Sequence, residues 1–428
     1  MKRKVNPWAW VPSLYFAEAL PYVAVMTVSV IMYKRLGISN TDIALYTGWL
    51  YLPWVIKPFW SPIVDLLRTK RWWIVAMQAV IALAFAGIAF TLPTSNCFQL
   101  SLAVFWVVAF TSATHDIAAD GFYMHGLTEE EQSFHVGIRS TFYRISTITG
   151  QGLLVMFAGW RETTTGSIPR AWSETFYLLS AFFLVAALYH AWVLPRPDSD
   201  HAVENSSVNS ILTGFVNTFA SFFRKPQAGV AILFMLLYRL PEAQLVKIIS
   251  PFMLDTVEKG GLGLSTEAVG FVYGTVGILG LTLGGIIGGV LVSIHGLKRW
   301  LWPMALSITV PDLVYVYLSY AQPESMLIIN SCVFLEQFGY GFGFTAFMLY
   351  LIYFSQGEHK TAHYAICTGF MALGMMLPGM AAGWLQEHMG YQYFFLWTIL
   401  CCLATFIVCI LIKIDPSFGR KEDSVHEK

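Results

Sequence analysis

The chain has 428 residues, of which 56% are hydrophobic, 16% aromatic and only 12% charged. Soluble domains usually carry about 25% charged residues. This chain therefore lacks the polar side chains needed to cover a soluble core, and its exposed surface is expected to face lipid. Basic and acidic side chains balance at 26 each, so no basic character indicates nucleic-acid binding.

A helix that spans a bilayer needs about 20 mostly apolar residues, and polar breaks divide this chain into twelve such segments. The first segment is interpreted as an uncleaved span, because it contains Glu18 and lacks the small-residue cleavage site of a signal peptide. The sequence thus predicts an all-α membrane protein with twelve transmembrane helices. The predicted spans are 8–32, 42–64, 72–94, 98–124, 136–159, 174–194, 227–254, 266–293, 299–319, 325–354, 361–385 and 391–413.

The longest polar stretch, residues 196–210, lies in the middle of the chain. It predicts a cytoplasmic linker, 196–225, between an N-terminal six-helix half, 1–195, and a C-terminal half, 226–414, which a cytoplasmic tail, 415–428, follows. With both termini inside, sixteen of the 26 lysines and arginines fall in inner segments and five in outer loops. Cytoplasmic loops collect these residues, so the distribution supports cytoplasmic termini.

Four pairs of similar segments recur between the two halves, in the same order and at offsets of 224 to 228 residues. For example, "LGISNTDIALYTG" at 36–48 resembles "LGLSTEAVGFVYG" at 262–274, and "SFHVGIRSTF" at 133–142 resembles "TAHYAICTGF" at 361–370. Two six-helix repeats joined by an inner linker are the plan of secondary transporters, which bind substrate near the bilayer midplane between the repeats. The repeat therefore predicts a transporter.

The segment "SPIVDLLRTKRWW" at 61–73 resembles the loop between helices 2 and 3 of the major facilitator superfamily. That pattern has a small residue, an acid four positions later and then a basic cluster. Asp65 takes the acid position, and Arg68, Lys70 and Arg71 supply the bases. An acid at a helix end can pair with bases and hold an inner gate in one state, so these four residues are predicted to gate. The alternative is plain anchoring by positive charge at the inner surface.

Few ionisable side chains fall within the predicted spans, where a charge at mid-bilayer costs about 2.5–3.5 kcal/mol on insertion scales. Asp116 and Asp120 are four residues apart, on one helix face. Two close carboxylates in a low dielectric retain a proton, because two ionised forms together are disfavoured. We therefore predict proton coupling by Asp116 and Asp120, with Glu18 as a third candidate. The alternative is a static ion-pair lock with bases of the next span.

Substrate-binding residues are predicted on three spans. The fifth span faces the acids with Arg139, Tyr143 and Arg144, and the second span places Lys57 close in sequence to Trp54. A cation among aromatic rings can hold a ligand carboxylate while the rings pack on a sugar or base; alternatively, Lys57 extends its charge toward the inner surface. The first span of the second half mirrors Glu18 roughly and adds the two remaining candidates, Arg239 and Glu242.

Three segments resemble a narrower family: "KPFWSPIVD" at 57–65, "HDIAAD" at 115–120 and "YRIS" at 143–146. They are similar to motifs of the AmpG-like muropeptide permeases, and related acetyl-coenzyme A transporters share parts of them. The resemblance implies a proton-driven importer of anhydromuropeptides, the sugar–peptide fragments of cell wall turnover. It places Lys57, Asp116, Asp120 and Arg144 on motif positions. The chain departs from the family at His115 and Gly121, where glutamine and alanine are more usual.

Together these features predict a proton symporter of a bacterial inner membrane that imports a polar solute, with an anhydromuropeptide as the leading candidate. The alternatives are another organic anion, such as a siderophore or coenzyme A ester, a membrane-embedded transferase, or a receptor that does not transport. The expected partners are the small-molecule solute, protons and the lipid bilayer, and the protein is expected to act as a monomer. No metal is expected, because His359 and His363 are spaced like a metal-binding pair but have no third ligand nearby. No cofactor is expected either, because the glycine-rich run at 274–289 lacks the Lys-Ser/Thr ending of a phosphate loop and instead predicts close helix packing.

Overall fold

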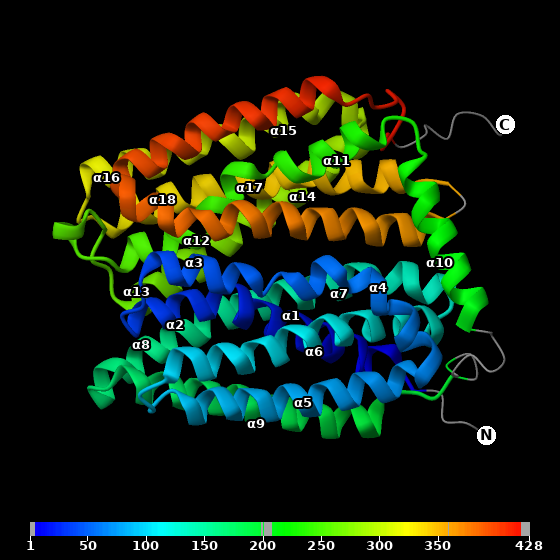
Figure 1. Ribbon diagram of the computed structural model, residues 1–428, viewed down its shortest axis with the longest axis horizontal. Coiled ribbons are helices and arrows are strands. Elements are labelled where there is room, and N and C mark those ends of the chain that lie inside the picture. Colours follow the sequence, from blue (N-terminus) through cyan, green and yellow to red (C-terminus); the bar gives the residue numbers. More distant parts are fainter. Residues whose placement is uncertain (1–4, 198–199, 201–207, 358, 421–428) are drawn as a thin grey trace. The chain divides into compact units, whose positions relative to one another are not determined.

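The computed structural model describes residues 5–197, 200, 208–357 and 359–420, and every regular element within these ranges is helical (Figure 1). The first part of the chain also contains two single-turn π-helical segments, in which hydrogen bonds reach one residue further than in an α-helix. Its elements are α1 (Val11–Val23), η2 (Ala24–Val28), α2 (Ser29–Arg35), α3 (Asn40–Trp49), α4 (Leu52–Leu67), α5 (Lys70–Thr91), α6 (Cys97–Gly126), α7 (Glu129–Ile148), η3 (Thr149–Leu153), α8 (Leu154–Thr165) and α9 (Ile168–Val193).

The second part of the chain repeats this pattern of long helices with short interruptions. Its elements are α10 (Val208–Phe223), α11 (Ala228–Leu237), α12 (Leu240–Leu254), α13 (Thr266–Phe271), η5 (Val272–Gly277), α14 (Ile278–His295), α15 (Leu297–Thr309), η6 (Val310–Asp312), α16 (Leu313–Ala321), α17 (Met326–Ser355) and α18 (Lys360–Leu411).

Each of the twelve predicted spans coincides with one of these helical runs. Nine runs of the described residues are long and apolar enough to cross a membrane. One of the nine, Ala362–Leu411, contains the last two predicted spans, which meet at Gly390 where the backbone leaves the helical conformation (φ 76°, ψ 166°). The two remaining spans correspond to α3 with α4 and to α7 with α8. The helices thus follow the predicted twelve-span plan.

The chain forms two compact units. Unit 1 consists of Met1–Gly214 together with Leu264–Thr275, and unit 2 consists of Phe215–Gly263 together with Val276–Lys428. A short segment from the second part of the chain therefore belongs to unit 1.

In unit 1, α5 packs against both α6 and α9, and α1 packs against α6 and α7 (Figure 1). The core between α1 and α6 contains Trp10 and Phe122, whose rings meet edge to face with centroids 5.2 Å apart. A capping box starts α7: the Glu131 amide donates to the Thr128 hydroxyl at 3.3 Å, and the Thr128 amide donates to the Glu131 carboxylate at 3.0 Å. These contacts hold α1, α6 and α7, which carry the candidate site, in one rigid packing.

Large apolar side chains point outward along α9. Leu184, Val185, Leu188 and Trp192 are each more than half exposed. A soluble protein rarely exposes a continuous apolar face of this kind, whereas a membrane-spanning helix presents it to lipid.

The segment Leu264–Thr275 packs closely against η3 and α8 within unit 1. A methyl group on Gly274 would lie 2.0 Å from the carbonyl oxygen of Gln151, and one on Gly159 would lie 2.4 Å from the amide nitrogen of Glu267. These distances are far below van der Waals contact, so the backbones can meet only because glycine has no side chain.

We expect Gly274→Ala to destabilise the protein by about 1–3 kcal/mol, because the added methyl group would overlap main-chain atoms that cannot move aside. Gly137→Ala is the matched control: a methyl group there meets nothing within 4 Å, and alanine favours the helix by about 1 kcal/mol. Thermal unfolding of the two purified variants measures both effects. Equal melting temperatures for Gly274→Ala and the parent would contradict the close backbone packing.

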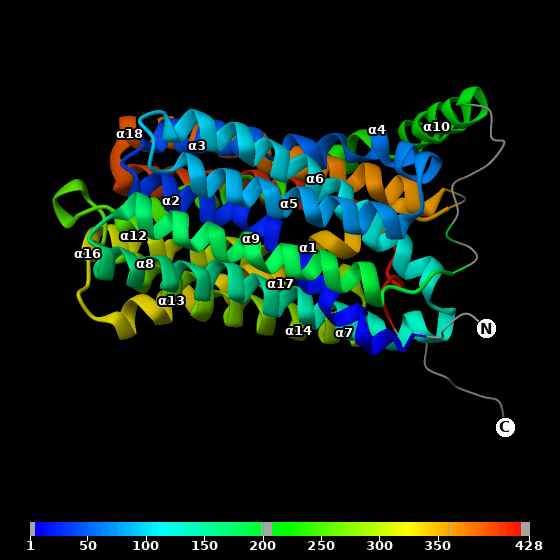
Figure 2. The same cartoon turned by 90° about the horizontal axis from the view of Figure 1, so that it is seen from below.

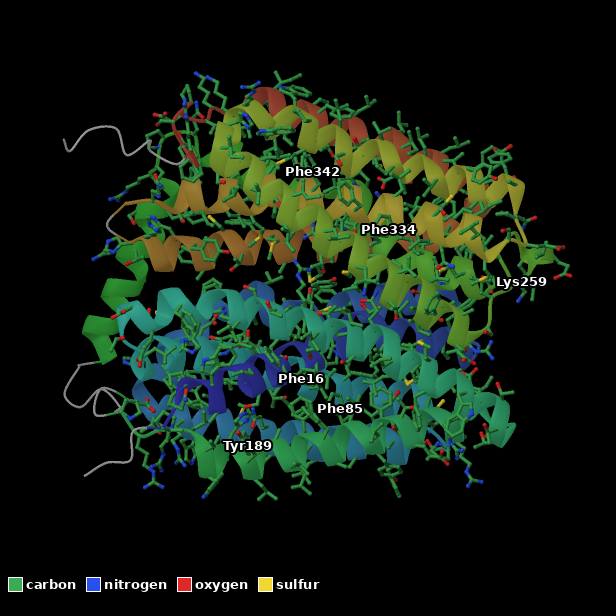
Figure 3. All side chains as sticks on the ribbon, turned by 180° about the vertical axis from the view of Figure 1, so that it is seen from behind. Phe16, Phe85, Tyr189, Lys259, Phe334 and Phe342 are labelled. Atoms are coloured by element: carbon green, nitrogen blue, oxygen red, sulfur yellow. The ribbon has the colours of Figure 1, made fainter. Side chains whose placement is uncertain are left out.

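In unit 2, α14 packs along α17 (Figure 2). Methyl groups on Gly280 and Gly284 would lie 2.7 Å and 2.0 Å from the carbonyl oxygens of Phe334 and Phe338. The prediction that the glycine-rich run serves close helix packing is therefore confirmed. The rings of Phe334, Phe338 and Phe342 stack at centroid separations of 6.4 and 6.5 Å along α17, on which Figure 3 labels the first and last.

Candidate functional site

Two ion pairs join three helices of unit 1 in a membrane-embedded cluster. Lys57 of α4 pairs with Asp116 of α6, and both side chains are about one quarter exposed. One helical turn further along α6, Asp120 accepts a hydrogen bond from the Arg139 guanidinium of α7 at 2.7 Å. Asp116 and Asp120 thus lie on one face of α6, as the spacing predicts, but each has its own basic partner.

Aromatic side chains surround the second ion pair. The Arg139 guanidinium lies 4.4 Å from the ring centroid of Tyr15 and 5.5 Å from that of Tyr123. The Tyr15 hydroxyl also points at the Asp120 carboxylate, at 3.4 Å. Cation–π contacts of this kind contribute about 0.5–2 kcal/mol each. The sequence analysis did not identify Tyr15, although its position three residues before Glu18 on α1 places the two on adjacent parts of one helix face.

Glu18 of α1 is the one acidic residue of this cluster without a described basic partner. It is only 7% exposed, and its Oε2 atom has no hydrogen-bond partner. Its carboxyl group interacts electrostatically with Asp116 and Asp120. Neighbouring carboxyl groups in a low dielectric disfavour being charged at the same time. Lys57 pairs with Asp116 and Arg139 with Asp120, so a proton on Glu18 would make the cluster of two bases and three acids electrically neutral.

The remaining candidates of unit 1 lie near this cluster. Tyr143 interacts electrostatically with Glu18, Asp116 and Arg144. Arg144 is half-buried and forms no ion pair with any acidic side chain that the structure describes. The Trp54 ring meets that of Tyr22 edge to face at 5.2 Å. Substrate binding by Arg144 and Trp54 therefore stays a prediction.

His115, the departure from the family motif beside Asp116, belongs to a separate buried chain of hydrogen bonds. Gln78 of α5 lies at its centre, with its amide nitrogen 2.9 Å from His115 Nε2 and its amide oxygen 2.8 Å from His190 Nδ1. The Ser13 hydroxyl lies 3.0 Å from His190 Nε2. All three hydrogen bonds can form when both histidines are neutral. The Gln78 amide nitrogen then donates to His115 Nε2, His190 Nδ1 donates to the Gln78 amide oxygen, and the Ser13 hydroxyl donates to His190 Nε2. His115 therefore holds α1, α5, α6 and α9 together and does not take part in the charged cluster.

We expect Gln78→Leu to destabilise the protein by about 2–6 kcal/mol, because it leaves two buried imidazole nitrogens without partners at about 1–3 kcal/mol each. Transport should keep its apparent KM, since this chain of hydrogen bonds is separate from the ion pairs. The measurements are the melting temperature and the concentration dependence of uptake at a temperature where the variant is folded. A raised KM with unchanged stability would show instead that the chain belongs to the binding site.

The four predicted gating residues have different surroundings. The Asp65 side chain lies outside the described residues. Arg68 is exposed and lies over the Trp72 ring at 5.9 Å. Arg71 donates to the main-chain carbonyl groups that end α9, and the amide groups of Lys70 and Arg71 donate to the linker carboxylate of Asp200 at 2.6 and 3.1 Å. Two of the gating candidates thus connect the start of α5 with the end of α9 and the linker.

Gly121, the second departure from the family motif, lies opposite one of these bases. A methyl group at this position would lie 2.8 Å from Cε of Lys70. The glycine therefore makes room for the buried stem of the lysine.

Arg239 and Glu242, the candidates from the second half of the chain, lie in unit 2. Arg239 precedes α12 and donates a hydrogen bond to the Tyr340 hydroxyl, while its guanidinium lies 4.7 Å from the ring centroid of Phe344. Glu242 lies in the first turn of α12, where the helix dipole favours a negative charge, and it interacts electrostatically with Arg239. The two residues thus influence each other electrostatically within unit 2.

Apolar helices in two similar sets, with ion pairs inside the membrane region, define the class of secondary transporters. The sequence model of the Major Facilitator Superfamily matches residues 13–356, and the chain belongs to this family. The solved structure of the D-xylose–proton symporter has the same fold, with a TM-score of 0.72 and 11% identity, and the match covers 96% of this chain and 98% of that one. The nucleoside transporter NupG matches with a TM-score of 0.68 and 16% identity over 95% of this chain and 98% of that one.

Curated relatives extend along most of the chain. The anhydromuropeptide permease of Escherichia coli K12 is 25% identical over 428 residues, which cover 96% of this chain and 80% of that protein. A Rickettsia conorii protein named AmpG 4 is 25% identical over 414 residues, covering 93% and 94%. The predicted twelve-helix fold and the resemblance to AmpG-like permeases are confirmed. The protein is a multi-pass membrane transporter, and the alternative of a membrane-embedded transferase is wrong.

Proposed function

We propose that this transporter is a symporter that imports an anhydromuropeptide together with protons. The observation that carries the proton part is the buried Glu18 carboxyl group, whose Oε2 atom has no hydrogen-bond partner and which interacts electrostatically with Asp116 and Asp120. The likeness to the Escherichia coli permease supports the choice of solute.

Proton transfer at Glu18 would change the charge of the cluster. With Glu18 protonated, the pairs Lys57–Asp116 and Arg139–Asp120 balance each other. When Glu18 releases its proton, a third negative charge lies beside Asp116 and competes for Lys57. In a low-dielectric site this competition costs several kcal/mol, so release favours a rearrangement of the helices that carry these groups. Proton binding and conformational change are thereby coupled.

The same cluster suits a solute with both a sugar and a peptide carboxylate. Arg144 and Lys57 can hold carboxylates by charge-assisted hydrogen bonds, and Trp54, Tyr22 and Tyr143 can pack against a sugar ring. Another organic anion would use the same cations but would have less need of the aromatic surface. We further propose a bacterial inner-membrane location with both termini in the cytoplasm.

Uptake by membrane vesicles that contain the protein tests the solute. Radiolabelled anhydromuropeptide should accumulate when the outside is more acidic than the inside, and unlabelled siderophores or coenzyme A esters in excess should not compete. A protonophore should abolish the accumulation. Preferential uptake of one of the other anions would replace the proposed solute, and accumulation that ignores the pH gradient would remove proton coupling.

A further inference from the structure

Unit 2 contains a second group of buried carboxyl groups, on three separate elements. Asp312 ends η6, Glu336 lies in the middle of α17, and Glu242 lies at the start of α12. They are 2%, 1% and 5% exposed, respectively. The carboxyl group of Asp312 interacts electrostatically with both of the others. Three buried acids that interact electrostatically, away from water, require an explanation of which of them are charged.

Two of the three carboxylates have groups that stabilise a negative charge. Glu336 Oε2 accepts hydrogen bonds from the Tyr315 hydroxyl at 2.7 Å and from the Gln337 side-chain amide at 2.9 Å. Glu242 lies beside the Arg239 guanidinium and in the first turn of its helix. Glu336 and Glu242 thus each have a neighbouring group that stabilises a negative charge.

Asp312 has no such support. Its buried Oδ2 atom has no hydrogen-bond partner. The elements that pack against η6 are α15, α16, α17 and α18, and together with α12 they present Glu336, Glu242 and the Cys402 thiol to Asp312, with Tyr315 committed to Glu336. The bases of α15, Lys298 and Arg299, lie in its first turn, about 20 Å along the helix from Asp312. The base of α12, Lys247, is also buried, and no ion pair or hydrogen bond of the described residues joins a cation to Asp312.

We infer that Asp312 is a second proton-binding residue of the transporter, and that the acidic side chains of Glu336 and Glu242 favour its protonated form. A proton fits better than a metal ion, because the described residues include no group of three His, Cys, Asp or Glu side chains placed to ligate a metal. A proton, in contrast, needs only one carboxyl group to bind it, and Asp312 is the one whose Oδ2 atom has no hydrogen-bond partner. The inference rests on the proposed proton symport for its role in transport, but the bound proton itself does not depend on the identity of the solute.

Infrared spectroscopy of the purified full-length protein tests the bound proton without any solute. Protonated carboxyl groups give a carbonyl band that carboxylates and amides lack. We expect Asp312→Asn to lose one such band at neutral pH and Glu18→Gln to lose a different one. Retention of every band of the parent in Asp312→Asn would overturn the inference, and so would loss of the Asp312 band when sodium replaces choline at constant ionic strength, since the site would then bind Na⁺.

Stability supplies an independent test if the band is difficult to assign. A protonated Asp312 without hydrogen-bond donors stabilises the fold no more than an apolar side chain of similar size. The variants Asp312→Leu and Asp312→Asn should therefore both melt at or above the melting temperature of the parent. Glu336→Gln is the matched control: it weakens two hydrogen bonds from described donors and should melt lower. Loss of folding in both Asp312 variants would overturn the inference, because it would mean that the carboxylate has stabilising partners.

Transport then shows whether the site is used. If the proposed symport holds, Asp312→Asn should carry fewer protons per solute than the parent while it still takes up solute. Failure of the parent to move any protons would refute the proposed symport and leave the infrared result standing. If Asp312→Asn has lost its infrared band but keeps the proton-to-solute ratio of the parent, the proton on Asp312 stays bound throughout transport. That result would overturn the role of Asp312 as a coupling site.

Discussion

Glu18→Gln is expected to abolish concentrative uptake while solute exchange continues. Glutamine keeps the size and the donor of a protonated glutamic acid but cannot release a proton, so the neutral form of the cluster becomes permanent. With one proton per solute, a gradient of one pH unit supplies about 1.4 kcal/mol and supports roughly tenfold accumulation. Without proton release the pH gradient supplies no free energy to the solute, so the ratio of inside to outside solute concentration in the variant should fall to about one.

Counterflow exchange in proteoliposomes is the accompanying measurement, because exchange needs the binding site and the conformational change but no net proton movement. We expect the variant to keep exchange at a rate similar to that of the parent. Glu130→Gln, on an exposed position of α7, is the control and should accumulate solute normally. Accumulation by Glu18→Gln in response to a pH gradient would refute the assignment of the proton to Glu18.

Lys57→Met is expected to have the second large effect, on stability and on binding together. Removal of the lysine leaves Asp116 beside Glu18 with no described base in ion-pair contact. Breaking one side of a buried ion pair costs about 3–5 kcal/mol, and we expect the lower end because the side chains are partly exposed. If Lys57 also holds a ligand carboxylate, its loss weakens binding by about 1.5–3 kcal/mol, or roughly 10- to 150-fold in apparent KM.

The double variant with Lys57→Met and Asp116→Asn separates the two effects. It removes both charges, so the melting temperature should recover most of the loss seen with Lys57→Met alone. The apparent KM should stay high, because the ligand cation is still missing. Recovery of both quantities would mean that Lys57 only neutralises Asp116, and the static ion-pair lock would then be the better account of this pair.

Periodicity and hydropathy predict most of the fold, because lipid demands long apolar helices and leaves few other solutions. The predicted gap between the last two spans contains Gly390, where the backbone turns. The second predicted span shows the limit. The structure divides it into α3 and α4, since Pro53 lies in the first turn of α4, where proline starts a helix more readily than it continues one.

The candidate site is only partly predictable. Helical spacing places Asp116 and Asp120 on one face, and sequence order puts Arg139 on the helix that follows. Which base meets which acid depends on how α4, α6 and α7 are packed, and no local pattern encodes the Lys57–Asp116 pair. The same holds for Tyr15 under Arg139 and for the partners of His115. These contacts join residues up to 124 positions apart, as Tyr15 and Arg139 are.

Proton movement that accompanies the solute is the most direct test of proton-coupled import of an anhydromuropeptide. Purified protein in proteoliposomes with a pH-sensitive dye inside, and no initial pH gradient, should acidify the interior when anhydromuropeptide is added outside. Glu18→Gln proteoliposomes should show no such signal. Solute entry into parent proteoliposomes without any change of internal pH would contradict proton symport.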